Sequence, residues 1–207
     1  RFESKIYFQE NLSSVDFVIA TGGDNSSINF TYLFKNKIRL IRKNRNSIAV
    51  LTGDESPSDY VNLSKDIFLY FGLGCRNVSK IFIPYGFNLD NLKPSFSRFQ
   101  HMLQNPHYFN NYHYQKAVLN INSTPFLDFE NLILLESKDI NSPISILYYE
   151  YYENLNSISK IIDFQKHNIQ CVVSKKMFIQ DSVKLGSSQN PSLYNFPDGE
   201  DVMRFLN

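Results

Sequence analysis

The chain is short of cysteine, of net charge and of long apolar runs. Two cysteines among 207 residues are too few for a disulfide framework, and two thiols alone cannot complete a structural zinc site. The four histidines show no ligand spacing beside them, so we expect no metal, and the cysteine count fits a reducing, cytoplasmic location. A formal net charge of +1 provides no field that would attract nucleic acid or an anionic membrane.

No apolar run approaches the roughly 20 residues that a membrane span requires, and no secretory signal opens the chain. The apolar residues that are present, 43% of the chain with 18 Phe and 13 Tyr, are ample for a packed core. The length suits one domain, or one domain and part of another. Because the first residue is Arg1 rather than Met, we expect a piece of a longer protein.

Strand-like and helix-like segments alternate along the chain, which predicts an α/β fold. Strands are expected at Asp16–Ala20, Lys37–Ile41, Ser47–Leu51, Val78–Pro84, Leu132–Glu136, Ile144–Tyr149 and Ile169–Ser174. Helices are expected at Ser26–Phe34, Leu89–Leu103, Tyr108–Asn120, Leu155–Phe164 and Asp201–Leu206, the first of them capped by Asn25 or Ser26. A further helix should start at Ser56-Pro57-Ser58-Asp59, which supplies a capping Ser, a Pro and an acid, and break at Gly72 and Gly74.

The most informative segment is Gly72-Leu73-Gly74-Cys75-Arg76, where a helix gives way to a strand. Glycine allows a substrate to approach the backbone closely, and a neighbouring arginine favours the thiolate, which is the nucleophilic form of cysteine. The amides of Cys75 and Arg76 are candidates to stabilise an oxyanion. Gly74, Cys75 and Arg76 are therefore candidate catalytic residues. On spacing alone, a small buried hydrophobic Cys75 explains the pattern equally well.

Other candidate groups have plainer explanations. Cys171 lies inside an apolar run and is best interpreted as a core residue. His107 and His113 flank a Tyr/Asn-rich stretch and fit partly exposed structural residues better than proton donors. The tyrosines of residues 148–152 fit a strand end that packs on both faces. A basic cluster fits a solvated loop better than a phosphate site and comprises Lys35, Lys37, Arg39, Arg42, Lys43 and Arg45.

Four segments in order resemble the C-terminal half of aldehyde dehydrogenases: Val18–Gly23, Ser47–Leu51, Gly72–Cys75 and Ser142–Ile144. In that family a strand ending in Thr-Gly-Ser faces the nicotinamide, a Gly-x-x-Cys carries the nucleophile, and a Gly-Pro-Val segment follows. The stretches at residues 71–80 (FGLGCRNVSK) and 190–201 are more specifically similar to the acyl-CoA reductase branch, which includes the long-chain enzymes of bioluminescence. The resemblance covers nearly the whole chain.

The resemblance implies the family's catalytic domain, an α/β domain with a mostly parallel twisted sheet flanked by helices, over residues 38–180. Residues 1–37 would then be the trailing part of a nucleotide-binding domain, and residues 181–207 a C-terminal segment that docks back. Members of the family tend to form homo-oligomers, and the natural acyl donor in this branch can be a partner protein. These assignments come from the resemblance and not from the spacing of residues.

The resemblance also implies a two-step reaction. The Cys75 thiolate attacks an acyl thioester such as a fatty acyl-CoA, coenzyme A leaves, and NADPH or NADH delivers hydride to give an aldehyde. Thr21, Gly22 and Gly23 would lie near the nicotinamide, and Asp139 occupies the place of a ribose-binding glutamate, four residues before Pro143. Apart from the resemblance, the glycines fit an ordinary strand-to-helix turn and Asp139 a solvated turn acid.

One departure from the family favours the reductase. Hydrolytic aldehyde dehydrogenases use a glutamate whose place falls near Ile41, yet no Asp or Glu occurs from Asn25 to Gly53. Without a base at this position, a water molecule is not activated there, and an acyl-enzyme persists until a hydride or a thiol takes the acyl group. A hydrolytic aldehyde dehydrogenase and a non-catalytic scaffold domain with a packed Cys75 stay open as alternatives.

Overall fold

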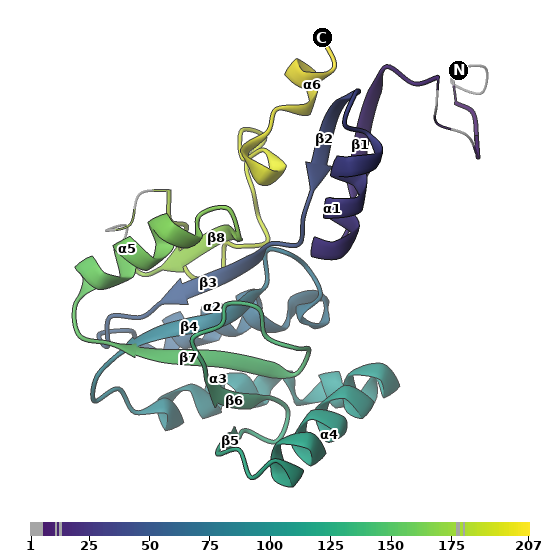
Figure 1. The fold of residues 1–207 in the computed structure, drawn as a ribbon. Helices are drawn as coiled ribbons and strands as arrows, with labels where there is room; N and C mark the ends of the chain where they lie inside the picture. The colour runs from purple at the N-terminus through teal and green to yellow at the C-terminus, as the bar shows by residue number, and fades with distance from the viewer. Residues whose placement is uncertain (1–5, 11, 13, 177–178, 180) are drawn as a thin grey trace. The chain divides into compact units, whose positions relative to one another are not determined.

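The structure, a computed structural model, describes residues 6–10, 12, 14–176, 179 and 181–207. It divides into two compact units: residues 1–44 with 196–207, and residues 45–195 (Figure 1). The assignment of residues 1–37 to a nucleotide-binding domain stays a prediction, and residues 1–5, 11 and 13 of that segment lie outside the described part. Within the described ranges, every helix is too short or too polar to cross a membrane.

The smaller unit is built on a β-α-β element. Strand β1 (Phe17–Thr21), helix α1 (Asp24–Leu33) and strand β2 (Ile38–Arg42) follow one another, and the two strands pair in parallel. Two short helices come from the end of the chain, η4 (Pro197–Gly199) and α6 (Val202–Phe205). The ring of Phe205 packs edge-on against Phe17 with 5.9 Å between centroids, so the two ends of the chain share this unit.

The expected cap of the first helix is wrong. Helix α1 begins after Gly23, which has an extended backbone and no side chain to accept a hydrogen bond, and not after Asn25 or Ser26. A Cβ atom at Gly22 would lie 2.7 Å from the Cβ of Ser26, so strand and helix approach each other closely at this turn. The close approach permitted by glycine, rather than a capping side chain, therefore determines where the helix begins.

The larger unit contains a six-stranded sheet in the order β5-β6-β7-β4-β3-β8. All neighbouring strands are parallel except β5 and β6, which confirms the mostly parallel sheet. Most strands lie within two residues of their predicted positions. Their bounds are β3 (Asn46–Val50), β4 (Val78–Pro84), β5 (Leu127–Asp128), β6 (Ile133–Glu136), β7 (Ile146–Tyr152) and β8 (Ile169–Ser174).

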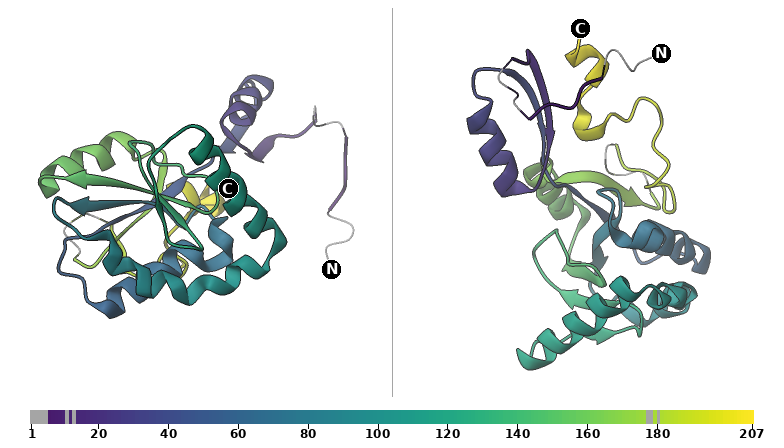
Figure 2. Two further views of the ribbon diagram at one scale, coloured as in Figure 1. Left: turned by 90° about the horizontal axis from the view of Figure 1, so that it is seen from below. Right: turned by 90° about the vertical axis from the view of Figure 1, so that its right-hand side faces the viewer.

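Helices cover both faces of this sheet (Figure 2). Ala49 of β3 packs with residues of helix α2 (Pro57–Phe68), whereas its neighbours Ile48 and Val50 pack with residues of helix α5 (Leu155–Gln165). Strand β3 is therefore buried on both faces, as its apolar sequence predicts. Helix α4 (Pro106–Ile121) packs on β6 and β7 through Tyr112 and Leu119.

Local signals place the start of α2 correctly. The Ser56 amide donates to the Asp59 carboxylate at 2.8 Å, and the Asp59 amide donates to the Ser56 hydroxyl at 3.3 Å, which together form a capping box. Pro57 is the first helical residue. The helix ends at Phe68, earlier than predicted, and the chain continues in a 3₁₀ helix, η1 (Leu69–Gly72).

The single helix expected over Leu89–Leu103 is wrong. The chain instead forms η2 (Leu89–Leu92), a single α-helical turn α3 (Lys93–Phe96) and the 3₁₀ helix η3 (Ser97–Gln104). Phe96, Phe99 and Met102 all pack into the core cluster at a spacing of three residues. Three residues per turn is the period of a 3₁₀ helix, so core packing selects this path over an α-helix.

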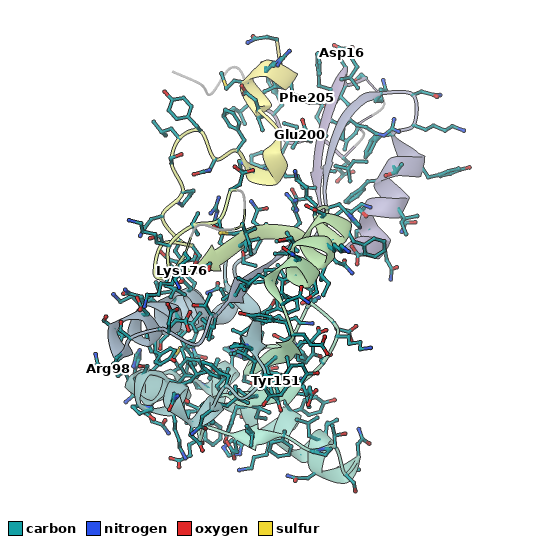
Figure 3. All side chains as sticks on the ribbon, turned by 90° about the vertical axis from the view of Figure 1, so that its left-hand side faces the viewer. Asp16, Arg98, Tyr151, Lys176, Glu200 and Phe205 are labelled. Carbon is teal, nitrogen blue, oxygen red and sulfur yellow. The ribbon has the colours of Figure 1, made fainter. Side chains whose placement is uncertain are left out.

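The tyrosine-rich strand β7 packs on both faces, as predicted. Tyr149 and Tyr151 contact one core cluster and Tyr152 another, and the Tyr152 hydroxyl donates to the Leu51 carbonyl at 2.6 Å. The ring of Tyr151 stacks on Tyr85 with 5.4 Å between centroids. Figure 3 shows side chains filling the space between the sheet and the helices of this unit.

The substitution Ser56→Ala removes one half of the capping box of α2. We expect it to lower the free energy of unfolding by about 1 kcal/mol, because the first-turn amides lose an acceptor. Chemical denaturation measures the change. The control Ser97→Ala alters an exposed serine in η3 and should shift stability by less than about 0.5 kcal/mol. Equal effects of both substitutions would contradict the role of the cap.

Candidate active site

Cys75 lies at the surface of the larger unit, in the tight turn that joins η1 to β4. The Asn77 amide donates to the Gly74 carbonyl at 2.9 Å and closes the turn, so Cys75 and Arg76 occupy its two central positions. The hydroxyl of Ser47, at the start of β3, donates to the Cys75 carbonyl at 2.9 Å. Cys75 is exposed and lies outside the hydrophobic core. The fold therefore fixes the backbone of this cysteine and leaves its side chain accessible.

Two amides of the turn are available to a ligand. The Gly74 amide is engaged, since it donates to the Asn77 side-chain oxygen at 2.8 Å. Within the described ranges, neither the Cys75 amide nor the Arg76 amide donates to a protein acceptor. A negative oxygen that forms next to the Cys75 sulfur would find donors in these two groups.

Asn77 holds the turn against the end of α2. Its side chain is buried, and its Nδ2 atom donates to the carbonyls of Asp66, Ile67 and Leu69 at 3.2, 3.2 and 2.8 Å. One amide side chain therefore satisfies carbonyls that a helix end leaves without intrahelical partners. No local sequence pattern indicates this role of Asn77, because the acceptors are backbone atoms 8 to 11 residues away.

The segment before the turn has a strained, exposed backbone. Tyr70, Phe71 and Gly72 follow one another at φ angles of 55°, 60° and 71°, which bulky residues adopt at a cost of about 1–2 kcal/mol each. Four exposed apolar residues of this segment, Leu69, Tyr70, Phe71 and Leu73, precede Cys75 in the sequence and are called the apolar collar. Tyr70 and Leu73 are 68% and 66% exposed. Strain of this kind concentrates at functional sites.

Two charged residues fix a distant loop beside the turn. Asp66, buried in α2, accepts hydrogen bonds from the amides of Gly186 and Ser188 at 2.5 and 3.0 Å. Burial raises the pKa of the Asp66 carboxyl, and these hydrogen bonds oppose the shift. The Arg76 guanidinium donates to the Ser188 carbonyl at 3.1 Å. Arg76 therefore binds this loop, and its catalytic role stays a prediction.

The segment that carries Asp139 lies beside the first residues of β4. The Ser79 hydroxyl donates to the Ile140 carbonyl at 2.7 Å, and Lys80 Nζ donates to the Ser137 carbonyl at 2.9 Å. Asp139 itself is exposed. Because Ser79 and Lys80 follow the cysteine turn directly, the structure brings the Asp139 segment and the start of that strand together.

The remaining predicted site residues belong to the smaller unit. Thr21 ends β1, and Gly22 and Gly23 form the connection to α1, with the Gly22 amide donating to the Arg42 carbonyl at 3.1 Å. The helix start has no side-chain cap, and a Cβ atom at Gly23 would meet only Asn44 Nδ2, at 3.7 Å. This turn therefore offers an open backbone next to a helix N-terminus.

The plainer interpretations of other residues agree with the structure, except in part for the basic cluster. Cys171 is buried, and burial raises the pKa of its thiol to about 11. The interpretation of the basic cluster as a solvated loop is wrong in part, because Arg39 and Arg42 lie in β2 and Arg39 donates to the carbonyls of Phe34 and Lys35 after α1. His113 is exposed on α4. No group of three or more potential metal ligands occurs among the described residues.

Comparison with solved structures finds aldehyde dehydrogenases. The NAD-dependent aldehyde dehydrogenase of Sinorhizobium meliloti matches with a TM-score of 0.58 and 11% identity, over 81% of this chain and 40% of that one. The substrate-bound AldH of Staphylococcus aureus matches with a TM-score of 0.54 and 17% identity, over 77% of this chain and 41% of that one. A mutant AldC of Pseudomonas syringae in complex with NAD+ and octanal matches with a TM-score of 0.54 and 10% identity, over 77% of this chain and 40% of that one.

No protein-family model and no curated protein matches the sequence. The chain spans about 40% of the length of these three structures. At sequence identities of 10%, 11% and 17%, the similarity to these structures shows the fold alone. The predicted fold is confirmed: the chain has the α/β fold of an aldehyde dehydrogenase catalytic domain, with a mostly parallel sheet between helices.

The substitution Asn77→Ala should lower the free energy of unfolding by about 2 kcal/mol, because it leaves the Gly74 amide and three carbonyls without their partner. Urea denaturation measures this, and hydrogen exchange at the Gly74 amide should become faster. Asn91→Ala, at an exposed position, is the matched control and should leave stability within about 0.5 kcal/mol. A stable Asn77→Ala protein would show that the turn is held by other contacts.

Iodoacetamide should distinguish the two cysteines. Near neutral pH we expect alkylation at Cys75, which is exposed, and protection of Cys171, because burial both shields its thiol and disfavours its thiolate. Peptide mass spectrometry identifies the labelled residue. Unfolding in urea should make the two rates similar. Equal rates in the folded protein would contradict the observed difference in exposure.

Proposed function

We propose that this chain carries the nucleophilic cysteine of an acyl-CoA reductase, an enzyme that converts an acyl thioester to an aldehyde with a reduced nicotinamide cofactor. The observation that carries the proposal is the exposed Cys75 at the centre of a tight turn, beside two amides that no protein acceptor engages in the described part of the chain. The aldehyde dehydrogenase fold supports the same class of chemistry by analogy.

In the first step, the Cys75 sulfur forms a bond to the carbonyl carbon of the thioester. The electron pair of the C=O double bond moves to the oxygen, where the amides of Cys75 and Arg76 donate to the negative charge. The charge then returns to the carbonyl, the bond to the coenzyme A sulfur breaks, and the departing thiolate takes up a proton. The acyl group remains on Cys75 as a thioester.

The apolar collar supports an acyl substrate. Leu69, Tyr70, Phe71 and Leu73 expose apolar surface in the six residues before Cys75, whereas the amides that favour an oxyanion lie at the cysteine itself. An acyl substrate with its carbonyl at the turn and its hydrocarbon chain along the collar would use both the amides and the apolar side chains. The Pseudomonas syringae neighbour contains octanal, an aldehyde with a hydrocarbon chain.

The residues predicted to hold the cofactor, taken unit by unit, suit polar groups of the kinds that a dinucleotide carries. The open backbone at Gly23 and the uncapped start of α1 suit a polar or anionic group, and the exposed Asp139 carboxylate suits a ribose hydroxyl. NADPH or NADH would supply hydride to the acyl carbon, and cleavage of the carbon–sulfur bond would then free the aldehyde and return the Cys75 thiolate.

The missing base favours reduction over hydrolysis. Residues 25–53 contain no carboxylate, and Ile41, near the place of the glutamate of hydrolytic enzymes, lies in β2. An S-acyl cysteine without a base to activate water persists long enough to be reduced. A homo-oligomer and an acyl-donor protein stay predictions of the family resemblance.

Exposure to acyl-CoAs of graded chain length should add one acyl mass to the protein, detected by intact-mass spectrometry and located at Cys75. Cys75→Ala should abolish the adduct, and Cys171→Ala, the matched control, should retain it. In full-length protein, NADPH should convert the adduct to aldehyde with release of coenzyme A.

Two results would overturn the proposal. Decay of the adduct to free acid, at the same rate with and without NADPH, would indicate a hydrolytic aldehyde dehydrogenase. Absence of an adduct at every chain length, with slow alkylation of Cys75, would indicate a non-catalytic scaffold domain.

A further inference from the structure

A lysine is buried in the central strand that follows the cysteine turn. Lys80 is the third residue of β4, is 1% exposed, and is flanked in the strand by Val78, Ile81 and Phe82, which are all buried. Burial lowers the pKa of Lys80, and the Glu150 carboxylate opposes this shift. An apolar side chain would fill the same space without the penalty of removing a charge from water. The position therefore requires an explanation beyond core packing.

The Lys80 ammonium contacts one group in β7, one in the segment that follows β6, and one in its own strand. It forms an ion pair with Glu150 of β7, donates to the Ser137 carbonyl at 2.9 Å, and lies 4.7 Å from the centre of the Phe82 ring. The Glu150 side chain is 25% exposed, so one end of the pair reaches the surface. Of these partners, Ser137 is the one that belongs to an irregular segment.

That segment is held at both ends, and Asp139 lies between them. The Ser137 amide donates to the Tyr149 carbonyl at 3.1 Å while its carbonyl accepts from Lys80. At the other end, the Ile140 carbonyl accepts from Ser79. The Asp139 amide donates to the Ser137 hydroxyl at 3.1 Å, which links the acid to the residue that Lys80 contacts.

We infer that Lys80, with Glu150, is a positioning residue for cofactor binding: the buried ion pair holds the Ser137–Ile140 segment so that the Asp139 carboxylate is placed to accept from the cofactor. This inference rests on the proposed function. Lys80 acts through Asp139 and does not touch the reacting atoms. Cys75 is fixed by other contacts, those of Ser47 and Asn77, so acyl transfer should not depend on Lys80.

A double-mutant cycle tests whether Lys80 and Asp139 act together. In full-length protein, NADPH affinity is measured by fluorescence for the parent, Lys80→Met, Asp139→Ala and the double variant. We expect each single change to weaken binding about tenfold, and the double variant to bind no more weakly than either single variant. Formation of the Cys75 adduct with acyl-CoA should stay within about twofold of the parent. Lys160→Met, at an exposed site on α5, is the control and should change neither the NADPH affinity nor the formation of the Cys75 adduct.

Glu150→Gln provides a second route if Lys80→Met fails to fold, because the Glu150 side chain is partly exposed; circular dichroism establishes the folded state. It enters the same cycle with Asp139→Ala and should show the same non-additive loss of affinity. The role of Lys80 would be overturned if the two single-variant losses of NADPH affinity multiplied in the double variant, or if formation of the Cys75 adduct fell in parallel. Either result would leave the proposed function intact. A parent protein that neither forms the adduct nor binds NADPH would overturn both.

Discussion

The side chain of Asn77 is the interaction on which the cysteine turn depends. Its amide nitrogen donates to three carbonyls at the end of α2, and its oxygen accepts from the Gly74 amide in the turn itself. The helix end and the turn therefore share one buried partner, and neither can move without breaking hydrogen bonds of the other. The accessible thiol of Cys75 has a defined position because of this link, together with the Ser47 contact to its carbonyl.

Two unfavourable features lie in β4 and in the segment that precedes it. The left-handed run at Tyr70 and Phe71 precedes β4 in the sequence, and the buried charge of Lys80 belongs to the third residue of that strand. The loop after the carboxyl end of β3 instead carries surface ion pairs, such as the pair of Asp54 with Lys176, which lowers the pKa of the Asp54 carboxyl to about 2. Ligands of open α/β sheets usually bind beyond the carboxyl ends of the strands. Cys75 instead precedes Val78, the first residue of β4.

The sequence predicted those parts of the structure that local chemistry determines. The capping residues at Ser56 located the start of α2, and the apolar run at residues 169–174 located β8. The 3₁₀ path through Phe96 and Met102 was missed, because core packing rather than local preference selects it. In the site, the glycines drew attention to Cys75, whereas the contacts of Asp66 and Lys80 join residues 120 and 70 positions apart. A lysine within an otherwise apolar strand was the one signal that could have indicated Lys80 in advance.

The division into two units has a consequence for synthesis on the ribosome. The larger unit is one continuous stretch, residues 45–195, and can begin to fold as soon as that stretch has emerged. The smaller unit needs residues 196–207 as well as residues before 45, and Phe17 meets Phe205 only after residues 45–195 have been synthesised. Residues 17–44 are therefore synthesised before the larger unit but acquire their full set of contacts after it.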